Sequence, residues 1–218
     1  MFKVDGEECE RIDDHGVPHL RYERVAHAAV LVGSIVYIVG GINSKGAVVH
    51  CEAINLQTCQ HHDMAPITDE ATINISTVHY DGWIYAVGGA SVLVSSIDMT
   101  FNTTNAVRLY SIANNTWLQI TNPDQLLQFP RFDHCIFIHQ NRLFVFGGNE
   151  KVTADKNTGK TMEGKLVNNM EIFDLTKVSA RCWYSERNIR ATDMLNRAYG
   201  CNVTIETDEW HSESEGRN

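Results

Sequence analysis

Three short segments decide the fold class: VYIVGG at residues 36–41, IYAVGG at 84–89 and LFVFGG at 143–148. Each carries an aromatic residue three positions before its first glycine, namely Tyr37, Tyr85 and Phe144. The glycine pairs are Gly40-Gly41, Gly88-Gly89 and Gly147-Gly148, at intervals of 48 and 59 residues. Self-similarity at a period of about 50 residues is typical of repeat architectures, so the chain is expected to consist of structural repeats.

An apolar run precedes each segment, and two residues that favour a tight turn separate the run from the segment. These turns are predicted at Gly33-Ser34, Asp81-Gly82 and Gln140-Asn141. Two β-rich runs joined in this way are typical of an antiparallel hairpin. Shorter β-rich runs follow in the second and third units, AVRLYSI before Trp117 and NMEIFDL before Trp183. Each unit is therefore predicted to form four strands.

A sheet of four short strands cannot bury both of its own faces, but several such sheets stacked radially bury them against one another. The chain is thus predicted to be an all-β protein, a β-propeller. The pattern resembles the kelch repeat, in which a double glycine follows the second strand, and a Tyr and a Trp are spaced across the third and fourth strands. These marks are Gly88, Gly89, Tyr110 and Trp117 in the second unit, and Gly147, Gly148, Phe173 and Trp183 in the third.

The units depart from this pattern at two places. In the first unit, Ile54 occupies the tyrosine place, and His61 or His62 falls where the tryptophan is expected. We therefore expect the fourth strand of this unit to pack less well. Arg24 and Arg131 each precede their glycine pair by sixteen residues, whereas the second unit has a threonine at this place. Any role of this arginine is expected to be absent from the second unit.

The resemblance covers residues 24–205, which we predict to be a kelch-type propeller domain. A fourth unit begins at Arg197, but residues 213 and 214 are not glycines. We predict about 3.5 four-stranded blades and an open ring, because closed propellers use four to eight blades. Residues 1–23 form an acidic segment with a candidate outer strand at Glu10–Ile12, and residues 206–218 form a polar tail. Unclosed blades lead us to expect a fragment of a longer protein, or self-association.

Composition excludes several classes of partner. The 218 residues include 18 Lys or Arg against 27 Asp or Glu, which gives a net charge of −9. Such a surface is a poor partner for nucleic acid or an anionic membrane. The N-terminal residues lack the apolar core of a signal peptide, and the six cysteines show no CxxC spacing. We therefore expect a cytoplasmic or nuclear protein with reduced thiols.

Residues that recur at repeat spacing are expected to be structural. His27 and His134 each stand thirteen residues before a first glycine, and we expect each ring to pack in a blade with one nitrogen hydrogen-bonded. The recurring aromatic residues are expected to pack between blades rather than to stack on nucleic acid bases.

Two motifs invite a chemical function, and their context argues against it. ADKNTGKT at residues 154–161 approximates a phosphate-binding loop but lacks the strand-to-helix setting, so we predict a solvated loop. Cys51, Cys59, His61 and His62 are the densest group of metal-ligand residue types, without the spacing of a zinc site. We predict no catalytic residue, no metal and no cofactor. A copper- or iron-dependent enzyme on a kelch propeller is the alternative.

The resemblance also implies a partner-binding rim. The connections after the glycine pairs vary most in length, and loops on a rigid scaffold commonly carry binding specificity. In kelch proteins, side chains at this rim hold a partner protein or peptide. The corresponding candidates are Arg24, Asn43, Lys45, Ser91, Arg131, Asn149 and Lys151. Because arginine suits carboxylates, an acidic partner is expected. The resemblance implies a non-catalytic interaction module that serves as a ubiquitin-ligase adaptor or a cytoskeletal scaffold.

Overall fold

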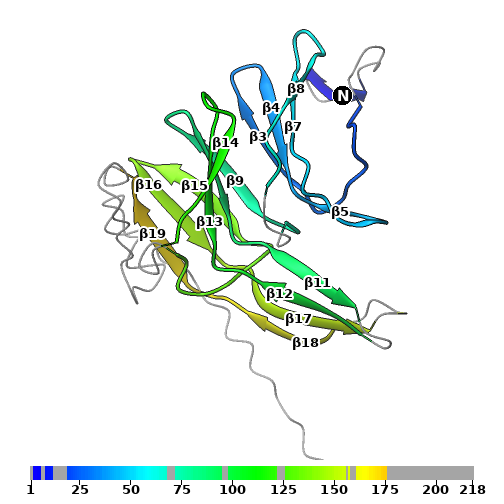
Figure 1. Ribbon diagram of the computed structural model, residues 1–218, viewed down its shortest axis with the longest axis vertical. Helices are drawn as coiled ribbons and strands as arrows, with labels where there is room; N and C mark the ends of the chain where they lie inside the picture. Colours follow the sequence, from blue (N-terminus) through cyan, green and yellow to red (C-terminus); the bar gives the residue numbers. More distant parts are fainter. Residues whose placement is uncertain are drawn as a thin grey trace, which may run out of the picture.

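The computed structural model describes residues 2–5, 8–11, 19–67, 72–94, 98–121, 126–155, 157 and 161–175. The regular elements within these ranges are β-strands (Figure 1), which confirms the predicted all-β class. No helix long and apolar enough to cross a membrane occurs in these ranges.

Three antiparallel sheets correspond to the predicted units, and we call them blades I, II and III. Blade I has the order β3 (Ala28–Val32), β4 (Ile35–Val39), β7 (Glu52–Asn55) and β8 (His61–Asp63). Blade II has the order β9 (Ser76–Tyr80), β10 (Trp83–Val87), β13 (Val107–Ser111) and β14 (Thr116–Gln119). Blade III is described for β15 (Cys135–His139), β16 (Arg142–Phe146) and β19 (Met170–Asp174).

The first strands of the blades, β3, β9 and β15, lie next to one another, with β9 in the middle. The blades therefore fan out from a shared inner side (Figure 1). The described sheets do not close into a ring. Trp183, the fourth unit from Arg197 and the tail 206–218 lie outside the described residues.

The turns between the first two strands of each blade have the conformation that the sequence predicts. Asp81 and Gly82 have φ angles of 48° and 77°, and Gln140 and Asn141 have φ angles of 48° and 58°. Two successive residues at positive φ match the twist of a two-residue hairpin turn. The predicted tight hairpins are confirmed at these two places.

The connections after the glycine pairs of blades II and III are hairpins rather than loops. They contain β11 (Ala90–Val94), β12 (Asp98–Thr103), β17 (Asn149–Asp155) and β18 (Thr161–Leu166). The two hairpins pair through β12 and β17 into one sheet of order β11-β12-β17-β18, which we call the insert sheet (Figure 1). The predicted solvated loop at 154–161 is thus wrong at both ends, because each end belongs to a strand of this sheet. Blade I has a shorter hairpin, β5 (Ile42–Asn43) and β6 (Gly46–Ala47).

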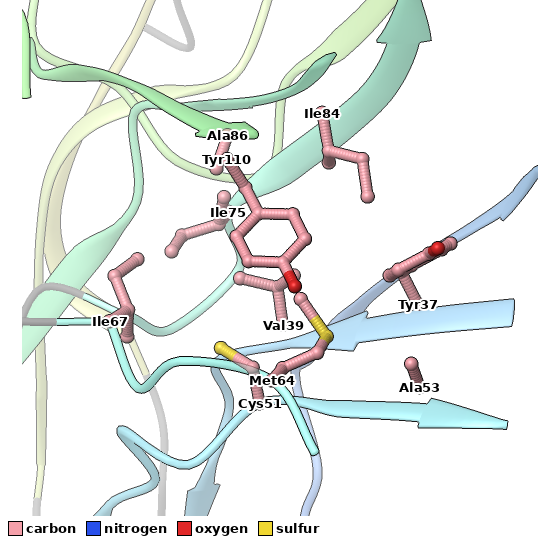
Figure 2. Packing of buried hydrophobic residues seen from close by; sticks show 10 residues of the cluster. All are labelled: Tyr37, Val39, Cys51, Ala53, Met64, Ile67, Ile75, Ile84, Ala86 and Tyr110. Carbon is pink, nitrogen blue, oxygen red and sulfur yellow. The ribbon is translucent and has the colours of Figure 1, made fainter. Parts of the chain in front are cut away.

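The core lies between the blades. At the interface of blades I and II, Tyr37, Val39 and Ala53 face Ile84, Ala86 and Tyr110 (Figure 2). The Tyr37 and Tyr110 ring centroids are 6.2 Å apart, and Trp117 donates its Nε1–H across the interface to the Ala65 carbonyl at 2.9 Å. A second cluster joins blades II and III, with Tyr85, Val87, Leu143, Val145 and Phe173 among its members. Because each buried large apolar side chain contributes about 1.5–3 kcal/mol, blade stacking supplies much of the stability.

The glycine pairs are required by the close approach of the next blade. A Cβ on Gly40 would lie closer than 3.0 Å to the Thr72 carbonyl oxygen, and one on Gly88 would meet the Arg131 carbonyl oxygen in the same way. The second glycines, Gly41 and Gly89, donate their N–H groups to these same carbonyls at 2.9 Å. The glycine pairs of blades I and II therefore each join their blade to the following one.

The strand register confirms the repeat positions that the sequence assigns to residues of the irregular first unit. Ile54 pairs with Val36 and with His61, as Tyr110 pairs with Ile84 and with Trp117. His61 therefore takes the tryptophan place.

The N-terminal residues form a separate hairpin. Glu8–Arg11 forms β2, which pairs with β1 (Phe2–Asp5). Among the described strands β2 pairs only with β1. A place for Glu10–Ile12 as the outer strand of a blade stays a prediction.

Candidate interaction site at the glycine-pair end

The strand register places the variable connections at one end of the blades. In blade I, Glu52 pairs with Ile38, two residues before the glycine pair, and also with Asp63, the last residue of β8. The hairpin after the glycines and the connection to the next blade therefore leave from the same end of the blade. The tight turns occupy the opposite end. We call the end that carries the hairpins and the connections between blades the glycine-pair end.

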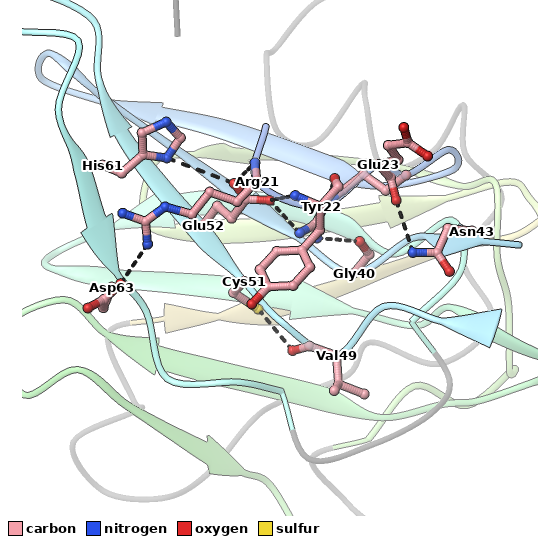
Figure 3. Close-up of polar contacts among 11 residues, drawn as sticks. Arg21, Tyr22, Glu23, Gly40, Asn43, Val49, Cys51, Glu52, His61 and Asp63 are labelled. Carbon is pink, nitrogen blue, oxygen red and sulfur yellow. Dashed lines mark hydrogen bonds and ion pairs between the residues drawn. The ribbon is translucent and has the colours of Figure 1, made fainter. Parts of the chain in front are cut away.

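A buried carboxylate organises the glycine-pair end of blade I (Figure 3). Arg24 donates from Nη2 to Glu52 Oε1 at 2.6 Å, and the two side chains are 0% and 3% exposed. Arg24 also donates from Nη1 to the Gly40 carbonyl at 2.8 Å. Glu52 accepts two further hydrogen bonds, from the backbone N–H groups of Arg21 at 2.7 Å and Tyr22 at 3.3 Å. This carboxylate thus fastens the incoming chain to its own blade.

Blade III repeats the arrangement. Arg131 donates from Nη2 to Glu171 and from Nη1 to the Gly147 carbonyl. Glu171 accepts the backbone N–H groups of Gln128 at 2.7 Å and Phe129 at 3.3 Å. Burial lowers the pKa of the Arg131 guanidinium, and the charge of Glu171 opposes that shift.

These contacts correct the predicted role of the two arginines. Arg24 and Arg131 are buried and bonded within their blades, so their guanidinium groups are not displayed on a rim to a carboxylate of a partner. Their function in this structure is to hold the glycine-pair end together.

In blade II an arginine also donates to the carbonyl of the first glycine, but this arginine stands at another position of the repeat. Thr72 stands at the arginine place and donates its hydroxyl to the Gly41 carbonyl at 3.1 Å. Arg108 occupies the place of the two glutamates, because it pairs with Ala86 as Glu52 pairs with Ile38, and it donates from Nη1 to the Gly88 carbonyl at 3.0 Å. Every described glycine pair therefore accepts a hydrogen bond from an arginine, which precedes the first strand in blades I and III and lies in β13 in blade II.

Glu52, Arg108 and Glu171 were not among the residues predicted from the sequence. A signal was available, since each stands two residues before the tyrosine place of its unit, at Ile54, Tyr110 and Phe173. The relation is hidden because the number of residues between each glycine pair and its Glu or Arg varies, since the hairpins that separate them differ in length.

The two repeat histidines differ in their surroundings. His134 is 5% exposed at the interface of blades II and III, and neither ring nitrogen has a hydrogen-bond partner among the described residues. Burial, reinforced by the charge of Arg131, lowers the pKa of His134 to about 3. His27 lies at the same place in blade I and is exposed. The expectation of one bonded nitrogen is therefore wrong for His134.

Two predicted rim residues lie in the blade I hairpin. Asn43 donates from Nδ2 to the Glu23 carbonyl at 3.1 Å and accepts the Lys45 N–H at 2.9 Å. This is the local bonding by which asparagine shapes a turn. Lys45 is exposed at the tip.

The other three predicted rim residues, Ser91, Asn149 and Lys151, lie in the insert sheet. Ser91 pairs with Asn102, which was not predicted, and Asn102 pairs with Lys151. The side chains of Ser91, Asn102 and Lys151 therefore form a row on one face of the sheet. Asn102 and Lys151 are exposed. Asn149 starts β17 and forms a backbone bridge to Phe132. On the opposite face, Phe101 stacks on the buried Phe132 with centroids 5.6 Å apart, so the polar row faces outward.

The segment that approximates a phosphate loop and the group of Cys and His residues form no catalytic arrangement in the described part of the chain. The segment that approximates a phosphate loop begins in β17 and ends at the first residue of β18. A helix that could hold phosphate therefore does not follow it. Among residues with described positions, no group of three His, Cys, Asp or Glu is placed to hold a metal ion.

The comparisons with known proteins agree with this fold. A family profile described as the Kelch motif matches residues 23–68. No curated protein matches the chain. A solved structure titled "Structure of YjhT" superposes with a TM-score of 0.50 at 14% identity, over 69% of this chain and 53% of that one. The chain thus spans about half of the length of that protein, and at this identity the likeness shows the fold alone. Residues 23–68 thus match the Kelch motif, and the described four-stranded sheets resemble the blades of a kelch-type β-propeller.

Proposed function

We propose that this protein is a non-catalytic interaction module that binds a partner protein through the outer face of the insert sheet. The observation that carries the proposal is the row Ser91, Asn102 and Lys151, which two separate blades build together. The buried arginines are bonded within their blades, so this row and the Lys45 hairpin carry the predicted rim residues that remain exposed.

The chemistry of this face favours a polar or acidic segment of the partner. Serine and asparagine side chains both donate and accept hydrogen bonds, and Lys151 adds an exposed positive charge. The neighbouring Lys165 is paired with Glu150 at 2.5 Å. One exposed ammonium beside hydrogen-bonding groups suits a carboxylate on the partner.

The wider role follows from the kelch resemblance. We propose a substrate-recognition part of a ubiquitin-ligase adaptor or a cytoskeletal scaffold, acting in the cytoplasm or nucleus. Both assemblies use a rigid display of a binding surface, which blades locked by buried ion pairs provide.

Site-specific photo-crosslinking tests the proposal. A crosslinking residue at Asn102 is expected to capture a defined partner in cells, and Lys151→Glu is expected to abolish that capture. The same residue at Thr116, which is exposed in the outer strand of blade II, is the control. Capture of the same proteins from both positions, or none at Asn102, contradicts the proposal.

Metal analysis tests the non-catalytic part separately. The purified chain is expected to hold neither copper nor iron in stoichiometric amount. A stoichiometric metal that supports turnover of a substrate contradicts a purely binding role.

A further inference from the structure

The insert sheet has two edges, and their chemistry differs. The strands β11 and β18 are its edges among the described strands. The pairing of β17 with β18 contains two register shifts, and β18 carries Glu163 and Lys165. Bulges and charged residues are the means by which natural sheets block edge pairing. β11, with the sequence ASVLV, has no charge, and its five pairs with β12 are in register. The edge at β11 is therefore unprotected.

Blade I does not supply a further strand to this edge. The second strand of the blade II hairpin pairs with the first strand of the blade III hairpin. By the same rule the blade I hairpin would pair with β11. Its strands, Ile42–Asn43 and Gly46–Ala47, have two residues each; they pair with each other and through an isolated bridge with Val25, and among the described strands neither pairs with β11. The sheet therefore stops at β11.

The backbone of β11 offers a symmetric set of groups on this edge. Ala90 donates its N–H to Ile73 at 2.9 Å and accepts the Ile73 N–H at 3.0 Å. In an antiparallel ladder the groups of every second residue point to the same side, so the N–H and C=O groups of Val92 and Val94 also face the open edge. Leu93 lies midway between these two residues and is 60% exposed.

Charge favours this edge as the place where two copies meet. The segments 90–103 and 149–166 together contain four lysines and four acidic residues, whereas the whole chain has a net charge of −9. Two acidic molecules repel one another, and the repulsion is smallest where the local charges balance. A strand identical to β11 also brings no charge to the edge.

We propose that two copies of this chain associate through β11, paired antiparallel about a two-fold axis at Leu93. Val92 of each copy then exchanges backbone hydrogen bonds with Val94 of the other. The two Leu93 side chains meet as a cross-strand pair, which buries exposed apolar surface. The two insert sheets become one continuous sheet with both polar rows on the same face, so a partner with two binding segments is held more tightly than by one copy.

Sedimentation equilibrium of the full chain over rising protein concentration tests this inference. The contact is short, so we expect a weak, reversible dimer that strengthens with added salt as repulsion between the acidic copies is screened. Leu93→Lys is expected to weaken the dimer at least about tenfold. Leu166→Lys is the matched control, because Leu166 is 78% exposed on the other edge strand, and it is expected to leave the dimer unchanged.

Disulfide formation gives an independent readout that does not depend on weak equilibrium association. Leu93→Cys, with the exposed Cys59 and Cys135 and the other cysteines except Cys51 replaced by serine, is expected to crosslink two chains on mild oxidation. Directly opposed residues on paired strands come close to disulfide reach. Leu166→Cys in the same background is expected to crosslink far more slowly. A chain that stays monomeric at every concentration overturns the inference, as does a dimer that Leu93→Lys leaves intact or equal crosslinking at the two positions.

Discussion

Arg24 and Glu52 form a buried ion pair, with Arg24 Nη2 2.6 Å from Glu52 Oε1, at the end of the blade where a binding rim was expected. The pair recurs as Arg131 and Glu171 in blade III. Removing one partner of a buried pair leaves an uncompensated charge, which is strongly destabilising.

Arg24→Ala is therefore expected to lower the free energy of unfolding by about 3–5 kcal/mol, measured by urea denaturation. Arg21→Ala is the matched control, because the Arg21 pair with Asp63 is exposed. That change is expected to cost at most about 1 kcal/mol.

A double variant separates the ion pair from the backbone contacts. Arg24→Met with Glu52→Leu removes both charges but leaves the N–H groups of Arg21 and Tyr22 without their acceptor. We expect it to remain destabilised by about 1–3 kcal/mol for each lost acceptor. Stability equal to the unmodified protein would show that Glu52 does not fasten the incoming chain.

His134 is expected to make the fold sensitive to acid. Its pKa is about 3 in the folded chain and 6.5 in the reference state, so the unfolded chain takes up a proton first as the pH falls. Above pH 6.5 the neutral ring makes its full contribution to the free energy of unfolding. Below pH 6.5 this contribution declines by up to about 1.4 kcal/mol per pH unit.

A matched pair of variants checks this pH dependence. Ile75 stands at the same place in blade II and is buried. His134→Ile is expected to flatten the decline of unfolding free energy between pH 6.5 and 4, and Ile75→His to steepen it. An unchanged profile in both variants would contradict the assignment.

The first glycine of a pair is expected to be irreplaceable only where the next blade approaches. Gly88 and Gly147 have φ angles of 62° and 69°, but among the described residues a Cβ at Gly147 meets nothing within 4 Å. Gly147→Ala is expected to cost about 1–3 kcal/mol from backbone strain alone. Gly88→Ala is expected to cost more, because the Arg131 carbonyl must move. Equal melting temperatures of the two variants would exclude the close approach as the cause.

Cysteine reactivity reports on the interface of blades I and II. Burial raises the pKa of the Cys51 thiol to about 11, whereas Cys59 and Cys135 are exposed. At pH 8 we expect a thiol reagent to modify Cys59 and Cys135 quickly and Cys51 only on unfolding, since the thiolate is the reactive form. Mass spectrometry of labelled peptides measures the three rates. Fast labelling of Cys51 in the folded chain would show that this interface opens.

The sequence predicted the blades because their signals are local. Asp81-Gly82 specifies a tight turn, and the repeat spacing placed Ile54 at the tyrosine position, which the strand register confirms. The sequence did not predict the insert sheet, because the pairing of β12 with β17 joins hairpins from different blades and no local pattern encodes that contact. Arg24 was placed on a rim because its repeat position was visible, whereas its partner Glu52 lies beyond a hairpin of variable length.

Hydrogen exchange of the chain with and without the partner captured at Asn102 shows whether the insert sheet is the binding surface. The partner is expected to protect the backbone amides of β11, β12 and β17 and to leave the tight turns at Asp81-Gly82 and Gln140-Asn141 unchanged. Protection confined to the turn end of the blades, with the insert sheet exchanging as in the free chain, would contradict it.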